Sequence, residues 1–517
     1  MKNFMALAAL FIGMALTAAG NQALAQIRFS ADFESGSMEK AELVSAEKKD
    51  GKEVVTYNFY SRFDPANPAN PKLAPSARWY YFKMEGVKDK QVILNVKNSD
   101  ARRPFYSYDN KNWTRFSATE SPDEKTLIKT YEQDAVYIAY FVPYTYSHLL
   151  DKIQEWGKRG CTQVGSIGTS EHDRDMPLLT ITENNGKKDK KVVYIHGRVH
   201  TSETPASWHM ERMIDVLVSD SPYAKSLREN TIFYILPFTN PDGVVEGNSR
   251  SNSSGVNMEV NWDDPQEVTT KEVRNMRAFL QSLLKKGNVD VFLNMHSQSM
   301  HQATYWVHTA ETSSDNFYKA LMLLANLTIN DNPYFAKKDL CFSKMGSRYC
   351  EGWFWNNSGE KTLAVTFETP YTYYSQNKDG EWVSLENLKE FADFNLLALG
   401  DYLQEGAPYR INVSEKGNGK GFKKMKDHSR FYFGKSYLKS KKDGARIKYV
   451  YKHNSELPEA SYEVYKWSVG ENKTISNQGE NEWVKVGELN HNGGKKIEYI
   501  YTAKEGEEVD NLLFKMK

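Results

Sequence analysis

The chain has 517 residues, of which 40% are apolar and 13% are aromatic, and its formal net charge is +1. This length and apolar content predict a globular protein of two to four domains. The nearly balanced charge gives the whole molecule no electrostatic bias toward nucleic acid, so we expect no nucleic-acid partner.

The first 25 residues differ from the rest of the chain. Lys2 precedes an apolar run over residues 4–19, and residues 23–25 (Ala-Leu-Ala) supply a small-x-small cleavage site before Gln26. This pattern predicts a secretory signal peptide that is cleaved near Ala25, followed by export to the periplasm or the medium. A membrane anchor is the alternative interpretation, but an anchor needs a longer apolar span. No later run of 18 apolar residues occurs, so we expect no stable membrane insertion.

Residues 26–147 are predicted to form a β-sandwich domain. Short runs alternate apolar and polar residues, and turn-forming clusters such as residues 64–71 separate these runs. The alternating runs are Val54–Phe59, Trp79–Met84, Val92–Val96 and Val136–Val142. The aromatic residues of this segment could line a binding face. Sandwich cores use the same residue types, so we interpret them as core.

The hydrophobic period changes near Tyr146, and strands alternate with helices over residues 148–405. The predicted strands are Leu178–Thr182, Val192–Ile195, Thr231–Phe238, Val289–Met295 and Thr362–Phe367. The predicted helices are His148–Trp156, Ala206–Val218, Thr270–Lys285, Ser314–Leu327 and Leu385–Gln404. This alternation predicts an α/β domain in which helices cover both faces of a mixed sheet.

Residues 406–517 have a different composition and are predicted to form a small, lysine-rich β domain. Between Val413 and Lys452 there are 13 Lys or Arg residues and 3 acids, interleaved with Phe and Tyr. Such a patch could bind an anionic polymer. Charge is balanced elsewhere in the chain, so the solvated face of a small domain is the simpler interpretation.

Cysteine is rare in this chain. The three residues Cys161, Cys341 and Cys350 are too few for a disulfide framework. Cys341 and Cys350 could form one bridge in an oxidising compartment, or they could remain buried free thiols.

A histidine that is followed three positions later by a carboxylate occurs five times, so this spacing alone does not identify a site. His200 and Glu203 stand out because they follow the apolar run 192–195 and precede a helical pattern with Pro205 near its start. The carboxyl ends of parallel strands are where α/β proteins bind ligands. One turn can direct an imidazole nitrogen and a carboxylate oxygen to a point about 2 Å from each, which suits Zn²⁺. A plain hydrogen bond between the two side chains is the alternative.

A third metal ligand should come from the end of another central strand. His296 ends the apolar run 289–295 and is the better candidate, whereas its rivals His196 and His301 lie inside a strand and beyond the start of a loop. Two His and one Glu leave one position open for water, which is typical of catalytic rather than structural zinc.

A zinc hydrolase also needs a carboxylate base and a cation near the developing oxyanion. Glu368 ends another apolar strand, and Pro370 follows it closely. Arg250 lies in the loop after the turn Asn240-Pro-Asp-Gly243. These two residues are the candidates for the base and the cation.

Taken in chain order, these motifs resemble the M14 zinc carboxypeptidases, the carboxypeptidase A-like family. The segments GRVHTSETPASW and NPDGVVEGNSR are most similar to those of the cytosolic carboxypeptidase-like branch. The N-terminal β domain of that branch typically ends in a phrase similar to YFVPYTYSHL, residues 140–149 here. The resemblance covers residues 30–400 and does not reach the C-terminal β-rich segment.

The resemblance implies a zinc carboxypeptidase-like α/β fold and a Zn²⁺ ion held by His200, Glu203 and His296. It further implies that Arg250 stabilises the oxyanion and that Glu368 acts first as general base and then as general acid.

Two further residues are candidates for contact with the substrate. Such enzymes bring a tyrosine over the substrate, and Tyr349 lies in the right segment, although not at the expected spacing. A tyrosine packed beside Cys350 is the alternative. Arg198, within the zinc motif, is a predicted substrate-binding residue.

The chain departs from the family pattern at one place. The family usually has Asp-Leu-Asn-Arg-Asn where residues 257–261 read Asn-Met-Glu-Val-Asn, so Glu259-Val260 replaces the Asn-Arg pair that clamps a terminal carboxylate. Because Val260 offers no ion pair and Glu259 repels a carboxylate, we predict that Glu259 contacts the substrate and that a blocked or amine-bearing substrate is preferred. The alternative is that Arg348 or Lys344 supplies the lost charge.

Together these inferences predict an exported zinc metallopeptidase that hydrolyses a peptide or amide bond. A zinc-containing binding protein that has lost catalysis is the alternative from a different class. An amidase or esterase variant is a further alternative, because the carboxylate clamp is replaced. The sequence does not predict the oligomeric state.

Overall fold

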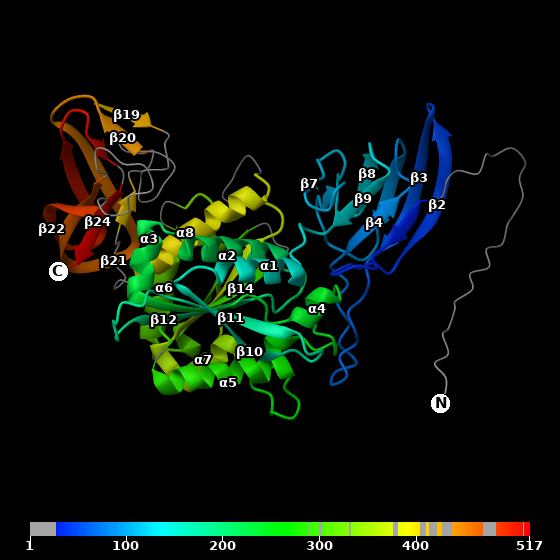
Figure 1. Ribbon diagram of the computed structural model, residues 1–517, viewed down its shortest axis with the longest axis horizontal. Helices are drawn as coiled ribbons and strands as arrows, with labels where there is room; N and C mark the ends of the chain where they lie inside the picture. The colour runs from blue at the N-terminus through cyan, green and yellow to red at the C-terminus, as the bar shows by residue number, and fades with distance from the viewer. Residues whose placement is uncertain are drawn as a thin grey trace, which may run out of the picture.

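The computed structural model shows three bodies arranged side by side (Figure 1). The residues that it describes are 27–287, 289–298, 302–329, 332–375, 381–403, 410–412, 421–425, 437–468, 482–509 and 511–516. The predicted signal peptide, the rival ligand His301 and much of the lysine-rich stretch after Val413 lie outside these ranges.

Two β-sheets form the N-terminal body. One has the strand order β1-β4-β9-β6-β7 and the other β2-β3-β5-β8. Their strands are β1 (Arg28–Ser30), β2 (Lys40–Lys49), β3 (Lys52–Tyr60), β4 (Tyr81–Glu85), β5 (Gln91–Val96), β6 (Phe105–Ser107), β7 (Thr114–Arg115), β8 (Thr126–Thr130) and β9 (Ala135–Ala139). Phe59 of β3 stacks on Phe82 of β4 with ring centroids 4.5 Å apart, so the two sheets share one core. The predicted aromatic core is therefore present.

An eight-stranded mixed sheet forms the central body, in the order β10-β11-β13-β12-β14-β17-β15-β16. Its strands are β10 (Thr162–Thr169), β11 (Asp175–Ile181), β12 (Lys191–Gly197), β13 (Thr231–Leu236), β14 (Val291–Gln298), β15 (Thr304–His308), β16 (Leu340–Ser343) and β17 (Leu363–Pro370). The central strands β13, β12, β14 and β17 run parallel to one another. Their carboxyl ends therefore meet at one edge of the sheet, where α/β proteins place ligands.

Helices cover both faces of this sheet, with α2 and α8 on one side and α5 and α7 on the other (Figure 1). The α-helices are α1 (Tyr146–Trp156), α2 (Thr204–Leu217), α3 (Pro222–Asn230), α4 (Pro241–Val245), α5 (Lys271–Lys286), α6 (Asp315–Ile329), α7 (Cys350–Ser358) and α8 (Leu385–Leu403). The 3₁₀ turns are η1 (Met258–Val260), η2 (Ala310–Thr312), η3 (Lys337–Asp339) and η4 (Gly359–Lys361). The predicted mixed α/β fold class is confirmed.

The C-terminal body is also made of β-strands and lies at the opposite end of the central body from the N-terminal sandwich (Figure 1). Its described strands are β18 (Arg410–Asn412), β19 (Phe422–Met425), β20 (Tyr437–Ser440), β21 (Ala445–Ser468), β22 (Glu482–Ala503), β23 (Glu508–Val509) and β24 (Asn511–Met516). The long strands β21 and β22 pair in antiparallel fashion.

All three cysteines are free thiols, and Cys350 is buried. Of the two alternatives for Cys341 and Cys350, the structure shows the unbridged one. Cys350 Sγ lies 3.2 Å from the side-chain nitrogen of Asn294, which donates to it.

Candidate metal centre

A tight turn after the central strand β12 carries His200 and Glu203. Arg198 begins this turn with φ at +62°, in the left-handed region that side chains seldom adopt. The backbone N–H of Ser202 donates to the carbonyl of Ser249 at 3.0 Å, and α2 begins directly after Glu203. Both His200 and Glu203 are about 2% exposed. The turn therefore holds an imidazole and a carboxylate inside the protein at the end of the sheet.

The Glu203 carboxylate lies between two imidazole rings. Its Oε1 is 2.8 Å from His200 Nδ1, and its Oε2 is 2.9 Å from His296 Nδ1. The backbone N–H of Ser297 donates to the same Oε2 at 3.0 Å. His296 comes from β14, whose eight residues are all buried. The structure thus brings together the three predicted ligands from two separate parts of the chain.

This cluster fits a zinc ion. One donor atom from each of the three residues can be chosen so that all lie within 4.8 Å of one another. Two imidazoles and one carboxylate form a donor set of catalytic zinc sites. The other nitrogen of His200, Nε2, is 3.2 Å from the Asn257 side-chain oxygen, and a ligand histidine needs such a partner to fix its orientation. His296 Nε2 is buried and has no hydrogen-bond partner among the described residues.

The charges of the cluster keep Glu203 ionised. Burial alone would raise the pKa of Glu203, but His200 and His296 hold it well below its usual range. Burial opposes the protonation of His296, yet Glu203 raises its pKa to about 9. In the absence of a metal, the imidazole rings therefore tend to be protonated, and their positive charge stabilises the Glu203 carboxylate. A divalent cation would replace these protons, because zinc binds neutral imidazole and ionised carboxylate.

Glu368 lies beside His296 on the neighbouring parallel strand. Residues 296 and 368 are directly paired between β14 and β17. The indole N–H of Trp306, on β15, donates to Glu368 Oε1 at 2.7 Å. Burial raises the pKa of Glu368, and the charge of Glu203 adds to this effect, while His296 opposes it. A partly exposed carboxylate with a raised pKa lies next to the three-residue cluster.

Arg250 and Glu259 also reach the cluster. Arg250 Nη1 is 3.8 Å from Glu203 Oε1, and Arg250 Nη2 is 3.3 Å from Glu259 Oε2. The same Glu259 oxygen is 3.2 Å from His200 Nε2. Burial would raise the pKa of Glu259, but His200, His296 and Arg250 lower it to about 2. The residue that replaces the family's asparagine is therefore an ionised partner of Arg250.

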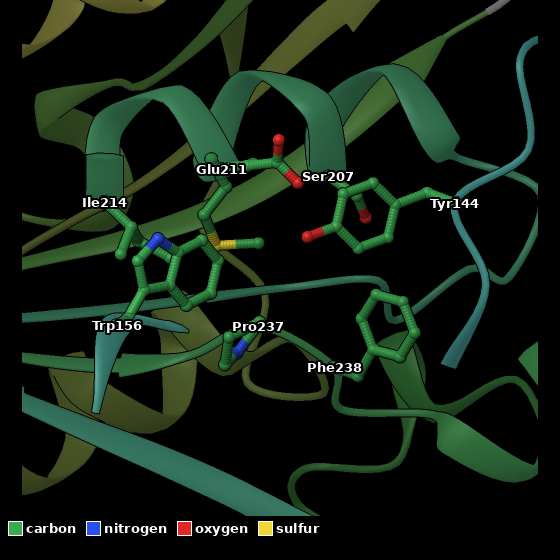
Figure 2. A pocket seen from close by; sticks show the side chains of 8 residues that line it. Tyr144, Trp156, Ser207, Glu211, Ile214, Pro237 and Phe238 are labelled. Atoms are coloured by element: carbon green, nitrogen blue, oxygen red, sulfur yellow. The ribbon is translucent and has the colours of Figure 1, made fainter. Parts of the chain in front are cut away.

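Arg198, the predicted substrate-binding residue, is fully buried away from this cluster. Its guanidinium donates to the carbonyls of Thr201 and Tyr144 and to Ser207 Oγ. Figure 2 shows Tyr144, Ser207 and Phe238 around one interior space beside α2. These contacts brace the turn that carries the ligands. We therefore correct the prediction that Arg198 binds substrate. Its buried guanidinium is already bonded to two backbone carbonyls and a hydroxyl, so Arg198 holds the backbone of the turn in place.

Tyr349 and the two rival cations lie on the segment before α7. Arg348 donates to the Tyr349 hydroxyl at 2.8 Å and stacks over its ring, and both side chains are at least partly exposed. Lys344 is exposed and pairs with Glu311 at 2.8 Å. The carbonyl of Arg348 accepts from the backbone N–H of Trp262, so this segment lies beside the loop of Glu259. Among the described residues, no hydrogen bond or ion pair joins Tyr349, Arg348 or Lys344 to the metal cluster.

The rival ligand His196 belongs to a different polar group. Its Nε2 is 3.0 Å from the Asn294 side-chain oxygen, and its Nδ1 is 3.3 Å from the Tyr194 hydroxyl. Burial lowers the pKa of His196 to about 3, which keeps it neutral. His196 pairs with Asn294, two residues before His296, so it lies on the same face of the sheet as His296 but further from the carboxyl edge where the ligands meet.

Three contacts of the site were not predicted from the sequence. They come from Asn257, which orients His200, from Trp306, which donates to Glu368, and from Asp64, which binds the loop of Arg250. Asp64 and Trp306 come from distant parts of the chain, and no local pattern marks them. Asn257 stands at the first position of the altered family motif, which is the one signal that could have indicated it.

Comparisons with known proteins agree with this geometry. Residues 148–381 match the family model described as zinc carboxypeptidase, Peptidase M14, and residues 29–141 match the cytosolic carboxypeptidase N-terminal domain. The central part of the chain is an M14 zinc carboxypeptidase domain. The chain is a metallocarboxypeptidase-like hydrolase with the N-terminal β domain of the cytosolic branch.

Relatives and solved structures support the same assignment. Cytosolic carboxypeptidase 6 of Mus musculus is 28% identical over 382 residues, which cover 67% of each chain. The Homo sapiens protein of that name is also 28% identical, with 67% of this chain and 72% of the relative covered. A metallo-carboxypeptidase of Burkholderia cenocepacia superposes with a TM-score of 0.63 at 21% identity, covering 74% of this chain and 100% of that chain. At this identity the structural likeness supports the fold alone.

The predicted export of the chain is contradicted by these comparisons. The mouse and human relatives are cytosolic carboxypeptidases, and the N-terminal domain matches the cytosolic type, which points to the cytosol. The export prediction rested on one apolar run with small residues after it, and such a run specifies hydrophobicity rather than a destination. Residues 1–25 themselves lie outside the described part of the chain. Among the described residues, no helix is long and apolar enough to cross a membrane.

Proposed function

We propose that this protein is a zinc-dependent hydrolase of a peptide or amide bond, with His200, Glu203 and His296 as the metal ligands. The observation that supports this most is the convergence of three buried donors at the carboxyl ends of parallel strands. When bound there, Zn²⁺ would polarise the scissile carbonyl and lower the pKa of a water molecule toward neutrality.

Glu368 is the proposed general base. It takes a proton from the attacking water and later returns it to the leaving nitrogen. Its raised pKa suits both steps, because a group that must accept and release a proton works best near the ambient pH. The Trp306 indole holds one carboxylate oxygen and leaves the other for the water.

Arg250 is the proposed stabiliser of the oxyanion. Its guanidinium already lies next to Glu203, so it can reach negative charge that develops on a carbonyl oxygen at the cluster. In the free protein, the Glu259 carboxylate lies 3.3 Å from one terminal nitrogen of Arg250. The substrate must therefore compete with Glu259 or share Arg250 with it. Tyr349 is retained as a candidate for covering the substrate.

The replaced clamp bears on specificity. Val260 stands where the family usually has arginine, so a terminal carboxylate gains no ion pair at that position and meets Glu259 nearby. We therefore propose that the Glu259 side favours an amide or an amine-bearing group. A comparison of kcat/KM for one peptide as free acid and as C-terminal amide tests this. A free-acid preference of more than about tenfold, equal to about 1.4 kcal/mol, would overturn it.

The proposed activity is tested with purified full-length protein. The zinc content would be measured first, followed by turnover on a panel of peptides, amides and esters. We expect about one zinc per chain and hydrolysis of at least one amide, with loss of both after treatment with a chelator. Faster cleavage of an ester than of its matched amide would favour the esterase variant.

A zinc-containing binding protein is the second candidate. Glu259 contacts both His200 and Arg250 at the position where the family usually has its carboxylate clamp, and this observation favours a protein that no longer removes C-terminal residues. Bound zinc without turnover on any compound of the panel would support this candidate.

We also propose domain boundaries for the chain, at residues 147/148 and 405/406. They place the sandwich, the α/β body and the lysine-rich β body in separate units. Limited proteolysis with mass spectrometry would test both boundaries.

A further inference from the structure

A polar pocket lies in the N-terminal sandwich, outside the metal cluster. Its volume is about 320 Å³. The residues that line it are Ser76, Ala77, Arg78, Asn98, Ser99, Asp100 and Lys125. Two of these side chains are cationic and one is anionic, and the others are small or neutral. The pocket therefore carries a net positive charge and has room for a small polar group.

Arg78 is held in place on one side only. Its Nε lies 3.2 Å from Asp100 Oδ2, and the other Asp100 oxygen accepts from the Tyr140 hydroxyl at 2.9 Å. The two terminal nitrogens of Arg78 make no hydrogen bond to any residue that the structure describes. The side chain is 23% exposed. A guanidinium fixed at Nε with its terminal nitrogens unused is arranged to bind a carboxylate.

This pocket lies next to the loop and turn of the metal cluster. The residue after Arg78 donates its backbone N–H to Ser249 Oγ at 2.9 Å, and Ser249 precedes Arg250. Tyr140, which holds Asp100, packs edge-on against Tyr371 with ring centroids 4.9 Å apart. The Tyr371 hydroxyl donates to the carbonyl of Ser202 at 3.0 Å, directly before Glu203. Two chains of contacts thus connect the wall of the pocket to the metal site.

The charge of Arg78 also acts on the metal site. Burial would lower the pKa of Arg78, but its attraction to Tyr140, Asp100, Tyr371 and Glu203 raises it above the ordinary value. Arg78 is therefore a permanent cation whose field reaches the Glu203 carboxylate. An anionic group near the metal cluster would be drawn to it.

We propose that this pocket binds a carboxylate group of the substrate, with Arg78 as its anchor and Lys125 as a second cation. The inference rests on the proposed hydrolase function. Val260 offers no cation to an acidic substrate. The pocket would supply one, and this cation belongs to the N-terminal sandwich. The carboxylate could be the chain terminus or an acidic side chain, and both present the same two oxygens to the guanidinium.

The test uses Arg78→Gln in the full-length protein with four matched peptides. The peptides carry a free-acid or an amide terminus, combined with a Glu or a Gln side chain beside the scissile bond. We expect Arg78→Gln to lower kcat/KM about ten- to hundredfold for the peptide that carries the recognised carboxylate, and to change it less than about twofold for the neutral peptide. If wild type prefers the free acid and this preference disappears in Arg78→Gln, the pocket takes the terminus, and the amide preference proposed for the Glu259 side is overturned. If the Glu preference disappears, it takes the side chain.

Two further variants separate binding from folding. Arg102→Gln removes a partly exposed cation of the same sandwich that pairs with Glu124 and does not line the pocket, so it should leave all four values unchanged. Arg78→Lys keeps the positive charge but lacks the paired N–H donors of a guanidinium, so it should retain part of the preference for the acidic peptide. Equal losses on acidic and neutral peptides, or no loss on either, would overturn the proposal.

A direct binding measurement keeps the inference independent of turnover. Calorimetry would compare N-acetylglycine with N-acetylglycinamide on wild-type protein and on Arg78→Gln, each with its zinc content measured. We expect tighter binding of the acid to wild type and equal binding of the two compounds to the variant. If no peptide is hydrolysed but this difference is present, the hydrolase proposal fails and the anion pocket stands. If the acid has no advantage on wild type, the pocket proposal fails.

Discussion

Asp64 of the N-terminal sandwich accepts a hydrogen bond from the backbone N–H of Arg250, at 2.8 Å. The same carboxylate accepts from the backbone N–H groups of Ser249 and Ser251 at 2.6 and 3.0 Å. Asp64 is 6% exposed, so three charge-assisted hydrogen bonds form inside the protein. One domain therefore fixes the backbone of a proposed catalytic loop in another.

We predict that Asp64→Asn weakens catalysis through Arg250. An asparagine is neutral and offers one acceptor oxygen instead of two, so all three N–H groups lose a charged partner and at least one loses its acceptor, at a cost of about 1.5–3 kcal/mol. We expect a fall in kcat/KM of about tenfold or more, with zinc content unchanged. Steady-state kinetics on the best substrate of the panel would measure it.

A double-mutant cycle shows whether this effect passes through Arg250. In the Arg250→Ala background, Asp64→Asn should cost little more, because the side chain that it positions is absent. The matched control is Asp109→Asn, which removes an aspartate that accepts from the backbone N–H groups of Lys111 and Asn112 in an exposed turn of the same sandwich. An equal loss from Asp64→Asn in both backgrounds would contradict the positioning role.

The proposed ligand and base can be separated by metal content. His200→Ala removes a ligand, so we expect loss of both zinc and turnover. Glu368→Gln keeps the three ligands and should retain zinc while turnover falls about 10²- to 10⁴-fold, the usual share of general base catalysis. Metal analysis and turnover on the same samples provide the comparison. Wild-type activity in Glu368→Gln would show that another group is the base.

A pH-dependent stability is predicted for Glu272, in the first turn of α5. This residue is fully buried, and its Oε2 has no hydrogen-bond partner among the described residues. Burial raises its pKa to about 7, and the charges of Glu171 and Asp242 add to the shift. The folded protein therefore binds this proton more tightly than the unfolded chain does. The stability that Glu272 contributes is full below about pH 4.5 and is lost as the pH rises through 7.

Glu272→Gln should remove this pH dependence. At pH 8 we expect the variant to unfold at a higher temperature than wild type, by a stabilisation on the order of 3 kcal/mol, and at pH 5 the difference should nearly vanish. Thermal unfolding at several pH values measures both. Glu267→Gln, at an exposed position just before the same helix, is the control and should change neither curve. A difference in unfolding temperature between Glu272→Gln and wild type that is the same at every pH would show that titration of Glu272 does not cause it.

The thiols give a further prediction. Because all three cysteines are free, three thiols should react with a thiol reagent after unfolding without a reductant. In the native protein Cys350 should stay unreactive, because burial raises the pKa of its thiol well above the usual value. Two missing thiols in the unfolded, unreduced sample would indicate a bridge between Cys341 and Cys350.

Much of the α/β fold could be predicted because its central elements are long and strongly patterned. Helices α2, α5, α6 and α8 begin and end within two residues of their predicted bounds. The edge strands β10 and β16, and β15 next to β16, were not predicted. Edge strands are only partly buried and their sequences need not be continuously apolar, so hydrophobic runs do not mark them.

The candidate site could be predicted where its residues stand at the ends of such runs. His200, Glu203, His296 and Glu368 each follow or end an apolar strand, and parallel pairing then brings these ends together. Arg198 shows the limit of this reasoning, because a position within a motif does not reveal whether a side chain points to the cluster or behind it. The role of Asp64 depends on how two distant bodies pack, and no spacing in the sequence encodes that.

The direct pairing of His296 with Glu368 between β14 and β17 also determines which changes the site can tolerate. The separation of the proposed ligand from the proposed base is set by backbone ladder hydrogen bonds rather than by side-chain packing. Inserting or deleting one residue in β17 upstream of Glu368 would place Phe367 or Thr369 opposite His296 and turn the carboxylate to the other face of the sheet. Loops around the site can change length without this penalty, because none of them sets that separation. Variation in substrate preference is therefore expected in the loops, whereas the length of β17 should be invariant in any active variant of this protein.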